Sequence, residues 1–230
     1  MLKHSKFVRF IPMIMILIMI AVVYFTKLYR FFSIEWIKSE HVFLKTYVDT
    51  HPFLSPLIFM AIYIVSVVLI IPDSTLLTLL AGYFFSFPLA VIYTLLSETI
   101  GGYLFFLALT GVVPTVKKAF LKKMSEKFRL HSASYLLFLR LSHLLPFWLI
   151  NSFAAYFKIK PWTFIWTTFI GLIPLTFVLV EAGHDLSKIF KSGKPFTLSA
   201  IFTPETEITL VLMGLLALLP LAYRAWKKKK

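Results

Sequence analysis

Three formal charges interrupt otherwise apolar sequence, and their side chains could do chemistry there. Asp73 follows a proline in the stretch IPDSTLLTLLAG, Glu98 stands in a long apolar run, and Arg140 interrupts a second such run. If these runs lie in a bilayer, each charge costs about 2.5–3.5 kcal/mol and by default marks a functional site. We therefore predict that the three side chains, together with His143, line a path for a substrate or a proton.

Each of these residues also has a structural interpretation. Asp73 would make a common N-cap for a helix beginning at Ser74, and Glu98 would need only a water-filled vestibule nearby. Arg140 could snorkel to the headgroups or could instead pair with Asp73, Glu98 or a lipid phosphate, which suits its planar fork. A lone histidine such as His143 is more often a hydrogen-bonded structural residue than a proton relay.

Several kinds of chemistry have no support in the sequence. There is no cysteine, so disulfides, thiolate zinc sites and cysteine nucleophiles are excluded. The run EAGHD at residues 181–185 fits no zinc or calcium pattern and is better explained by a helix ending at its glycine. No nucleotide-binding loop, Ser-His-Asp order or H-E-x-x-H motif occurs. We expect neither an enzyme nor a bound metal or cofactor.

The composition predicts an integral membrane protein. Of 230 residues, 59% are hydrophobic and 15% are charged, whereas ordinary soluble domains are about 45–50% apolar and about 25% charged. The net charge of +14 is gathered in short basic runs between apolar blocks, which is typical of membrane topology rather than of nucleic-acid binding.

The basic runs also predict which segments face the cytoplasm. By the positive-inside rule, the N-terminus, the segment from Lys117 to Arg129 and the tail from Lys227 to Lys230 are cytoplasmic. Segments 27–49 and 181–207 are nearly neutral and are placed outside. The first apolar block, 10–26, is interpreted as an uncleaved signal-anchor helix, with a cleaved signal peptide as the alternative.

These constraints predict an all-α polytopic fold in three parts. Residues 1–52 hold the signal anchor and an interfacial segment, 53–185 form the membrane core, and 186–230 hold an outer loop, a last transmembrane helix and the basic tail. Charge alone equally allows three full crossings between residues 50 and 116. The preferred core runs as a re-entrant hairpin 53–87, a crossing 88–111, a basic cytoplasmic segment 117–131, a second hairpin 132–157 and a crossing 161–180.

An internal repeat favours the two hairpins. Residues 72–88, PDSTLLTLLAGYFFSFP, and residues 146–161, PFWLINSFAAYFKIKP, share a proline, a pair of small residues, Tyr-Phe and a final proline. The first hairpin would turn near Pro72 and the second near Pro146, and each is followed by an apolar segment containing glycine. Two such copies entering from opposite faces make an inverted-topology repeat, as in many transporters.

Four stretches together resemble one known family. They are IPDSTLLTLLAG, ETIGGYLFFLALTG, FLRLSHLLPFWLINSFAAYF and FIGLIPLTFVLVEAG, and they cover roughly residues 55–185. The chain resembles the SNARE-associated Golgi proteins, the VTT-domain or DedA superfamily, nearest the branch of the yeast late-Golgi vesicle protein and its bacterial relatives. The resemblance implies two opposed re-entrant hairpins and movement of lipids or lipid carriers between leaflets, with proton coupling in some members.

The resemblance and the small residues together give the candidate packing positions. Arg140 and Pro72 fall on motif positions of the family, and glycines in the crossings permit close helix approach. The candidate hairpin and packing residues are Pro72, Ala81, Gly82, Gly101, Gly102, Pro146, Asn151, Gly171 and Pro174.

The expected function is movement of phospholipid or a lipid-linked carrier between leaflets. One alternative is a proton-coupled transporter of a small solute or ion that uses Glu98 and His143, and another is a scaffold for membrane organisation or vesicle traffic. The expected partners are membrane lipids, with anionic headgroups bound by the basic segments, and self-association into a homo-oligomer is compatible with the sequence. The membrane would be the plasma membrane of a bacterium or the Golgi or ER membrane of a eukaryote.

Overall fold

The structure is a computed structural model in which residues 34–71, 74–112 and 131–184 are described, with scattered positions at 14, 18, 21–23, 25–27, 186, 208–209, 211–212 and 215. The signal-anchor prediction for residues 10–26 therefore falls largely outside the described residues. So do Pro72, Asp73, both basic segments and most of the predicted last helix. These predictions stay untested.

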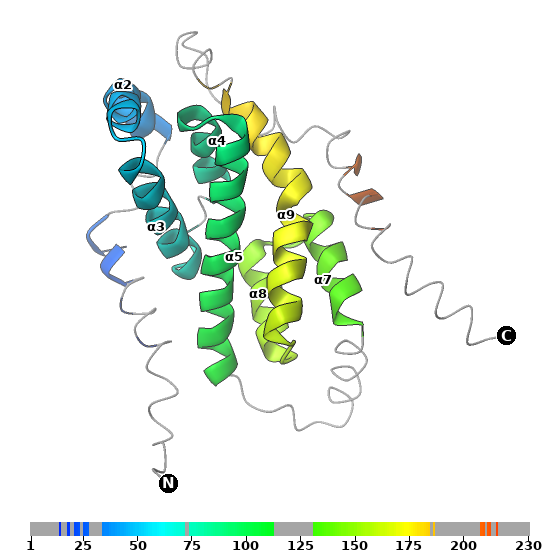
Figure 1. The fold of residues 1–230 in the computed structure, drawn as a ribbon. Helices are drawn as coiled ribbons and strands as arrows, with labels where there is room; N and C mark the ends of the chain where they lie inside the picture. The colour runs from blue at the N-terminus through cyan, green and yellow to red at the C-terminus, as the bar shows by residue number, and fades with distance from the viewer. Residues whose placement is uncertain are drawn as a thin grey trace, which may run out of the picture. The chain divides into compact units, whose positions relative to one another are not determined.

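The described residues are helical and contain no strand (Figure 1). This confirms the all-α prediction, while the path of the helices through a membrane stays a prediction. The helices are α2 (Ile34–Thr50), α3 (Leu54–Val68), α4 (Ser74–Phe84), α5 (Phe87–Val112), α7 (Ser132–Leu141), α8 (Phe147–Tyr156) and α9 (Pro161–His184).

Two of these helices, α5 and α9, are long and apolar enough to cross a membrane. With 26 and 24 residues, they are about 39 Å and about 36 Å long, against a hydrocarbon core of about 30 Å. The four hairpin helices are shorter. The 15 residues of α3 and 11 of α4 give about 23 Å and about 17 Å, and the 10 residues each of α7 and α8 give about 15 Å.

Each segment predicted as a re-entrant hairpin contains a pair of short helices in contact, α3 with α4 and α7 with α8, and their re-entrant path stays a prediction. Each turn contains a non-glycine residue with positive φ, Ile70 at 57° and His143 at 50°. Such a backbone is unfavourable for a β-branched residue such as Ile70. The chain adopts it because α3 ends in a Schellman motif, in which Ile71 N donates to Ser66 O at 3.0 Å and Ile70 N donates to Val67 O at 3.2 Å.

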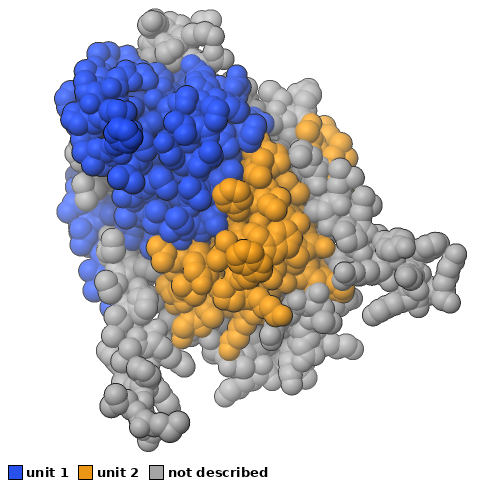
Figure 2. All heavy atoms as spheres, viewed as in Figure 1, with its two compact units in different colours: residues 1–102, 176–197 blue, residues 103–175, 198–230 orange. Residues whose placement is uncertain are grey.

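The chain divides into two compact units (Figure 2). Unit 1 holds residues 1–102 and 176–197, and unit 2 holds residues 103–175 and 198–230. Unit 1 therefore contains α2, the hairpin of α3 and α4, the first part of α5 and the last part of α9. Unit 2 contains the hairpin of α7 and α8 with the remaining parts of α5 and α9. Each unit is thus one hairpin packed on segments of the same two long helices, which agrees with the predicted repeat.

Glycine brings α4 and α9 into backbone contact within unit 1. A Cβ atom at Gly82 would overlap the carbonyl oxygen of Val180, and a Cβ at Gly183 would overlap the carbonyl oxygen of Leu79. Small residues permit such close crossings because they leave the helix surface flat. Gly82 thus lies at this crossing and faces Gly183 across it.

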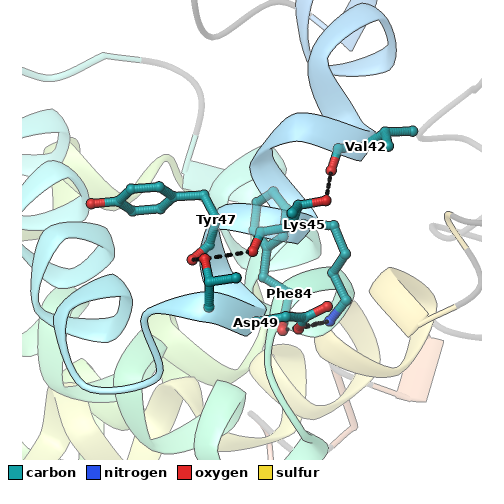
Figure 3. Close-up of polar contacts among 7 residues, drawn as sticks. Val42, Lys45, Tyr47, Asp49 and Phe84 are labelled. Carbon is teal, nitrogen blue, oxygen red and sulfur yellow. Dashed lines mark hydrogen bonds and ion pairs between the residues drawn. The ribbon is translucent and has the colours of Figure 1, made fainter.

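Helix α2, which falls in the predicted interfacial segment, is fastened to the end of α4. The Nζ of Lys45 donates to the carbonyl oxygen of Phe84 at 3.1 Å and forms an ion pair with Asp49 at 3.2 Å (Figure 3). A cation at the last carbonyl of a helix is favourable because it meets the negative end of the helix dipole. In Figure 1, α2 is seen nearly end-on beside α3, so it lies crosswise to the hairpin.

Candidate functional site

A cluster of oxygen atoms from two buried and two half-buried residues joins the three helices of the first repeat. The hydroxyl of Tyr63 on α3 lies 2.8 Å from Oε1 of Glu98 on α5 and 2.9 Å from Oγ1 of Thr78 on α4. It also lies 3.1 Å from the carbonyl oxygen of Ser74, the first residue of α4, which accepts a bond of 2.9 Å from Thr78. We call these four residues the acidic cluster.

The acidic cluster lies inside unit 1. Tyr63 is fully buried and Thr78 is 1% exposed. The ring of Tyr63 packs edge-on against Phe59, with 5.8 Å between ring centroids. One turn beyond Glu98, a Cβ at Gly101 would lie 2.9 Å from Cβ of Val67 on α3. The glycine thus lets α5 approach α3 closely enough for Tyr63 to reach the carboxyl group.

A second buried cluster joins the three helices of the second repeat. Arg140 on α7 is only 2% exposed, and its Nη2 donates to Oδ1 of Asn151 on α8 at 2.6 Å and to Oγ1 of Thr168 on α9 at 3.0 Å. The guanidinium carbon lies 4.3 Å from the ring centroid of Phe147 and 5.4 Å from that of Phe164. Arginine binds such ring faces through cation–π attraction. We call these five residues the basic cluster.

The chemistry of Arg140 fixes the orientation of the Asn151 amide. A guanidinium group carries only donors, so the amide must turn its oxygen toward Arg140. Its Nδ2 is then directed elsewhere, buried and with no hydrogen-bond acceptor among the described residues. Buried polar groups in proteins normally have a partner. The basic cluster therefore presents an amide donor that an added acceptor group could use.

Gly171 positions the arginine. A Cβ at Gly171 on α9 would lie 2.6 Å from Cβ of Arg140, so only glycine lets α7 approach α9 this closely. Around this contact, unit 2 is packed with apolar side chains, among them Phe106, Leu136 and Ile150. The guanidinium group is consequently held in a low-dielectric environment, where its interactions with polar groups are strong.

The two clusters have the same plan and opposite formal charge. In each, a side chain from the first hairpin arm contacts a polar residue of the second arm and a residue of the following long helix. When Ala81 is aligned with Ala154 in the repeat, Thr78 falls on Asn151. Thr78 and Asn151 are the second-arm side chains that form hydrogen bonds with Tyr63 and Arg140.

The remaining candidate residues have mainly structural positions. His143 is exposed in the turn of the second hairpin, and Pro146 is the N-cap residue of α8. Glu98 belongs to unit 1 and Arg140 to unit 2, so a pairing between them stays a prediction, as does one with Asp73. The other predicted packing residues are placed as follows: Ala81, Gly101 and Gly102 are buried, and Pro174 lies inside α9.

Sequence reasoning missed Tyr63, Thr78 and Thr168 as partners of the charged residues. Uncharged hydroxyl groups are common in membrane helices, so their presence in an apolar run gives no signal. The repeat gave a signal for Thr78 alone, because aligning its two copies pairs Thr78 with Asn151. Among the described residues, no three histidine, aspartate or glutamate side chains gather as metal ligands.

Comparison with known proteins identifies the family. The VTT domain family matches residues 71–185, a span that begins at the turn of the first hairpin and includes α4 to α9. Transmembrane protein 41B of Mus musculus is 29% identical over 194 residues, which cover 81% of this chain and 65% of that protein. The Homo sapiens protein of that name is 28% identical over the same shares.

The same protein of Xenopus tropicalis is 29% identical over 167 residues, covering 70% of this chain and 58% of the relative. The matched region thus spans less than two thirds of the length of these relatives. No solved structure matches the chain. The family match covers half of the chain and agrees with the resemblance seen in the sequence motifs. The chain is a membrane protein that belongs to the VTT-domain family of SNARE-associated Golgi proteins.

Proposed function

We propose that the chain moves phospholipid, or a lipid-linked carrier, between the leaflets of a membrane. The observation that carries the proposal is the buried arginine of the basic cluster. A guanidinium group inside an apolar helical unit is costly, so it is rarely retained without a function. Arg140 and Asn151 both carry hydrogen-bond donors in the basic cluster, and a headgroup phosphate supplies matching acceptor oxygens.

The proposed path through the membrane uses two re-entrant hairpins. Each arm of the second hairpin is about 15 Å long, half of the hydrocarbon thickness of about 30 Å. Such a hairpin can enter and leave by one face only, and its turn would then lie near the midplane. Arg140 is near the end of α7, beside that turn. A headgroup that reached Arg140 would thus have travelled about half of the way across.

The lipid tails would remain in the bilayer during this movement. Along the unit 1 part of α5, one stripe of large apolar side chains is exposed, at Leu89, Ile92, Leu96 and Ile100. The spacing of three and four residues places them on one helix face, which suits contact with acyl chains. A lipid could therefore keep its tails against such a face while a polar cluster binds the headgroup.

The topology proposed with this function follows from the basic segments. The hairpin of α3 and α4 would enter from outside, the hairpin of α7 and α8 from the cytoplasm, and both termini would be cytoplasmic. Lys158 and Lys160, at the exit of the second hairpin, are exposed, which suits a cytoplasmic position. Anionic headgroups would bind the segments from Lys117 to Arg129 and from Lys227 to Lys230.

Reconstitution of the full chain into liposomes tests the proposal. Labelled phospholipid placed in one leaflet should exchange faster in vesicles that contain the protein than in protein-free vesicles. The assay should cover several headgroups and a range of pH. Exchange that stays at the protein-free rate under all of these conditions would contradict lipid movement.

A further inference from the structure

When Glu98 is ionised, the acidic cluster has more short oxygen–oxygen contacts than it has hydroxyl hydrogens to fill them. Four contacts of 2.8–3.1 Å join Tyr63, Thr78, Glu98 and the Ser74 carbonyl. Each hydroxyl has a single hydrogen, while carbonyl and ionised carboxylate oxygens have none. With Glu98 ionised, two hydrogens must serve four contacts.

An ionised Glu98 leaves two of the four contacts without a hydrogen whichever way the hydroxyls turn. If Thr78 donates to the Ser74 carbonyl and Tyr63 donates to Glu98, the contact of 2.9 Å between Tyr63 and Thr78 has no donor. If Thr78 donates to Tyr63, the Ser74 carbonyl loses its hydroxyl donor. An unmade hydrogen bond between buried polar groups is unfavourable.

A proton on Glu98 lets three of the four contacts be filled and leaves only the longest, the 3.1 Å contact between the Tyr63 hydroxyl and the Ser74 carbonyl, without its own hydrogen. The carboxyl group then donates to Tyr63, Tyr63 donates to Thr78, and Thr78 donates to the Ser74 carbonyl. Each of the three hydroxyl hydrogens has one acceptor, and the chain ends on an oxygen that only accepts. Consecutive hydrogen bonds of this kind polarise and strengthen one another.

We propose that Glu98 is a proton-binding site that fastens the first hairpin to α5. In the protonated state, a directed chain of hydrogen bonds runs from α5 through Tyr63 on α3 to Thr78 and Ser74 on α4. Loss of the proton reverses the Tyr63 hydroxyl toward the carboxylate, and one link of the chain is lost. The lost link is the one between Tyr63 and Thr78, so occupancy by a proton changes the bonding between α3 and α4.

Several other ionisable groups in the described part of unit 1 make their contacts away from these four residues. On α4, Ser74 and Thr78 do not titrate, and Tyr83 lies at the other end of the helix, nine residues and about 14 Å from Ser74. Lys45 of α2 meets α4 at Phe84, ten residues and about 15 Å from Ser74. On α9, Glu181 is exposed and His184 stacks on Phe87. Asp73 immediately precedes Ser74 and lies outside the described residues.

The inference concerns the protein's own hydrogen bonds and does not depend on which substrate it moves. Its test is the thermal unfolding of the purified full chain in lipid nanodiscs, from about pH 5 to about pH 9. The first variant is Glu98→Gln, which is permanently neutral and whose amide can donate to Tyr63. The second is Tyr63→Phe, which removes the hydroxyl that joins Glu98 to Thr78. Glu181→Gln removes an exposed carboxylate of the same unit and is the matched control.

The sign of the pH effect follows from proton linkage. If the folded state retains a proton that the unfolded state releases, the stability falls as the pH rises. The Tm of the wild type and of Glu181→Gln should therefore fall as the pH rises over this range, by about 2–4 °C when one hydrogen bond of the cluster is lost. Glu98→Gln should keep the low-pH Tm of the wild type at every pH, and Tyr63→Phe should lower Tm most at low pH.

Infrared spectroscopy provides the second measurement. The carbonyl stretching band of a protonated carboxyl group should be present in the wild type at neutral pH, absent in Glu98→Gln and retained in Glu181→Gln. Absence of this band from the wild type, or its persistence in Glu98→Gln, would overturn the proposal. So would a Glu98→Gln variant whose Tm falls with pH as steeply as that of the wild type.

Discussion

Arg140 of α7 donates a hydrogen bond of 2.6 Å to Asn151 of α8, so a charged group inside an apolar unit links the two arms of the second hairpin. Because the donor is charged, this bond is stronger than one between neutral groups. It also has a consequence for Asn151, whose amide nitrogen is left facing away from the arginine. The same pair of residues thus links α7 to α8 and, in the proposed function, would offer donors to a headgroup phosphate.

Substitution of Arg140 should slow lipid exchange between leaflets. Arg140→Gln removes the charge and the bonds to Asn151 and Thr168, each worth about 1.5–3 kcal/mol for a charged donor, so we expect at least about a tenfold slower exchange. Arg140→Lys keeps the charge but not the planar fork, and should be intermediate. The liposome exchange assay measures both. Lys160→Gln, which removes an exposed cation, is the control and should exchange like the wild type, whereas wild-type exchange by Arg140→Gln would contradict the role of Arg140.

Asn151 and Thr168 should show coupled effects on stability, because both accept from the same nitrogen of Arg140. We expect Asn151→Leu and Thr168→Val each to cost about 1–3 kcal/mol, and the double variant to differ from the sum of the two by about 0.5 kcal/mol or more. Thermal or denaturant unfolding measures the cycle. Strict additivity would show that Arg140 does not join them.

Thr94→Val is the matched control for these substitutions. Thr94 is fully buried, and its hydroxyl has no hydrogen-bond partner among the described residues. Replacing an unsatisfied buried hydroxyl by a methyl group of the same shape should leave stability unchanged or raise it. If Thr94→Val lost as much stability as Thr168→Val, the effect at Thr168 could not be assigned to its hydrogen bond with Arg140.

Alanine at the crossing of α4 and α9 should destabilise the fold. In Gly82→Ala and Gly183→Ala, the new methyl group would overlap backbone carbonyl oxygens, which cannot move without separating the helices. At Gly101 the nearest atom is Cβ of Val67, at 2.9 Å, so Gly101→Ala should cost less. Overpacking typically costs about 1–3 kcal/mol. Unfolding temperatures give the order, and a wild-type Tm for Gly82→Ala would contradict the close crossing.

The repeat and the charges made much of the fold predictable from the sequence. The hairpin predicted for residues 53–87 contains α3 and α4, and the one predicted for residues 132–157 contains α7 and α8. Proline marked the N-cap of α8 at Pro146 and the start of α9 at Pro161. The crossing predicted to end at residue 180, where the apolar run ends, continues as a helix through polar residues to His184.

The partners of the charged residues were not predictable in the same way. Glu98 and Arg140 were found because a charge in apolar sequence is conspicuous. Tyr63 and Thr168 come from helices distant in the sequence, and nothing in their local pattern distinguishes them from other hydroxyl residues. The crossing partner Gly183 was also missed, since its importance depends on where α4 meets α9.

The proposed path depends on two hairpins that would enter from opposite faces of the membrane, and cysteine labelling tests this prediction directly. The chain has no natural cysteine, so single cysteines at Ile71 and Leu145, beside the two turns, can be probed with a membrane-impermeant thiol reagent. Phe53→Cys and Lys160→Cys report the sides on which the hairpins begin and end. We predict that Ile71→Cys reacts only from the outside, like Phe53→Cys, and that Leu145→Cys reacts only from the cytoplasm, like Lys160→Cys. Labelling of both turns from the same side would contradict the inverted arrangement.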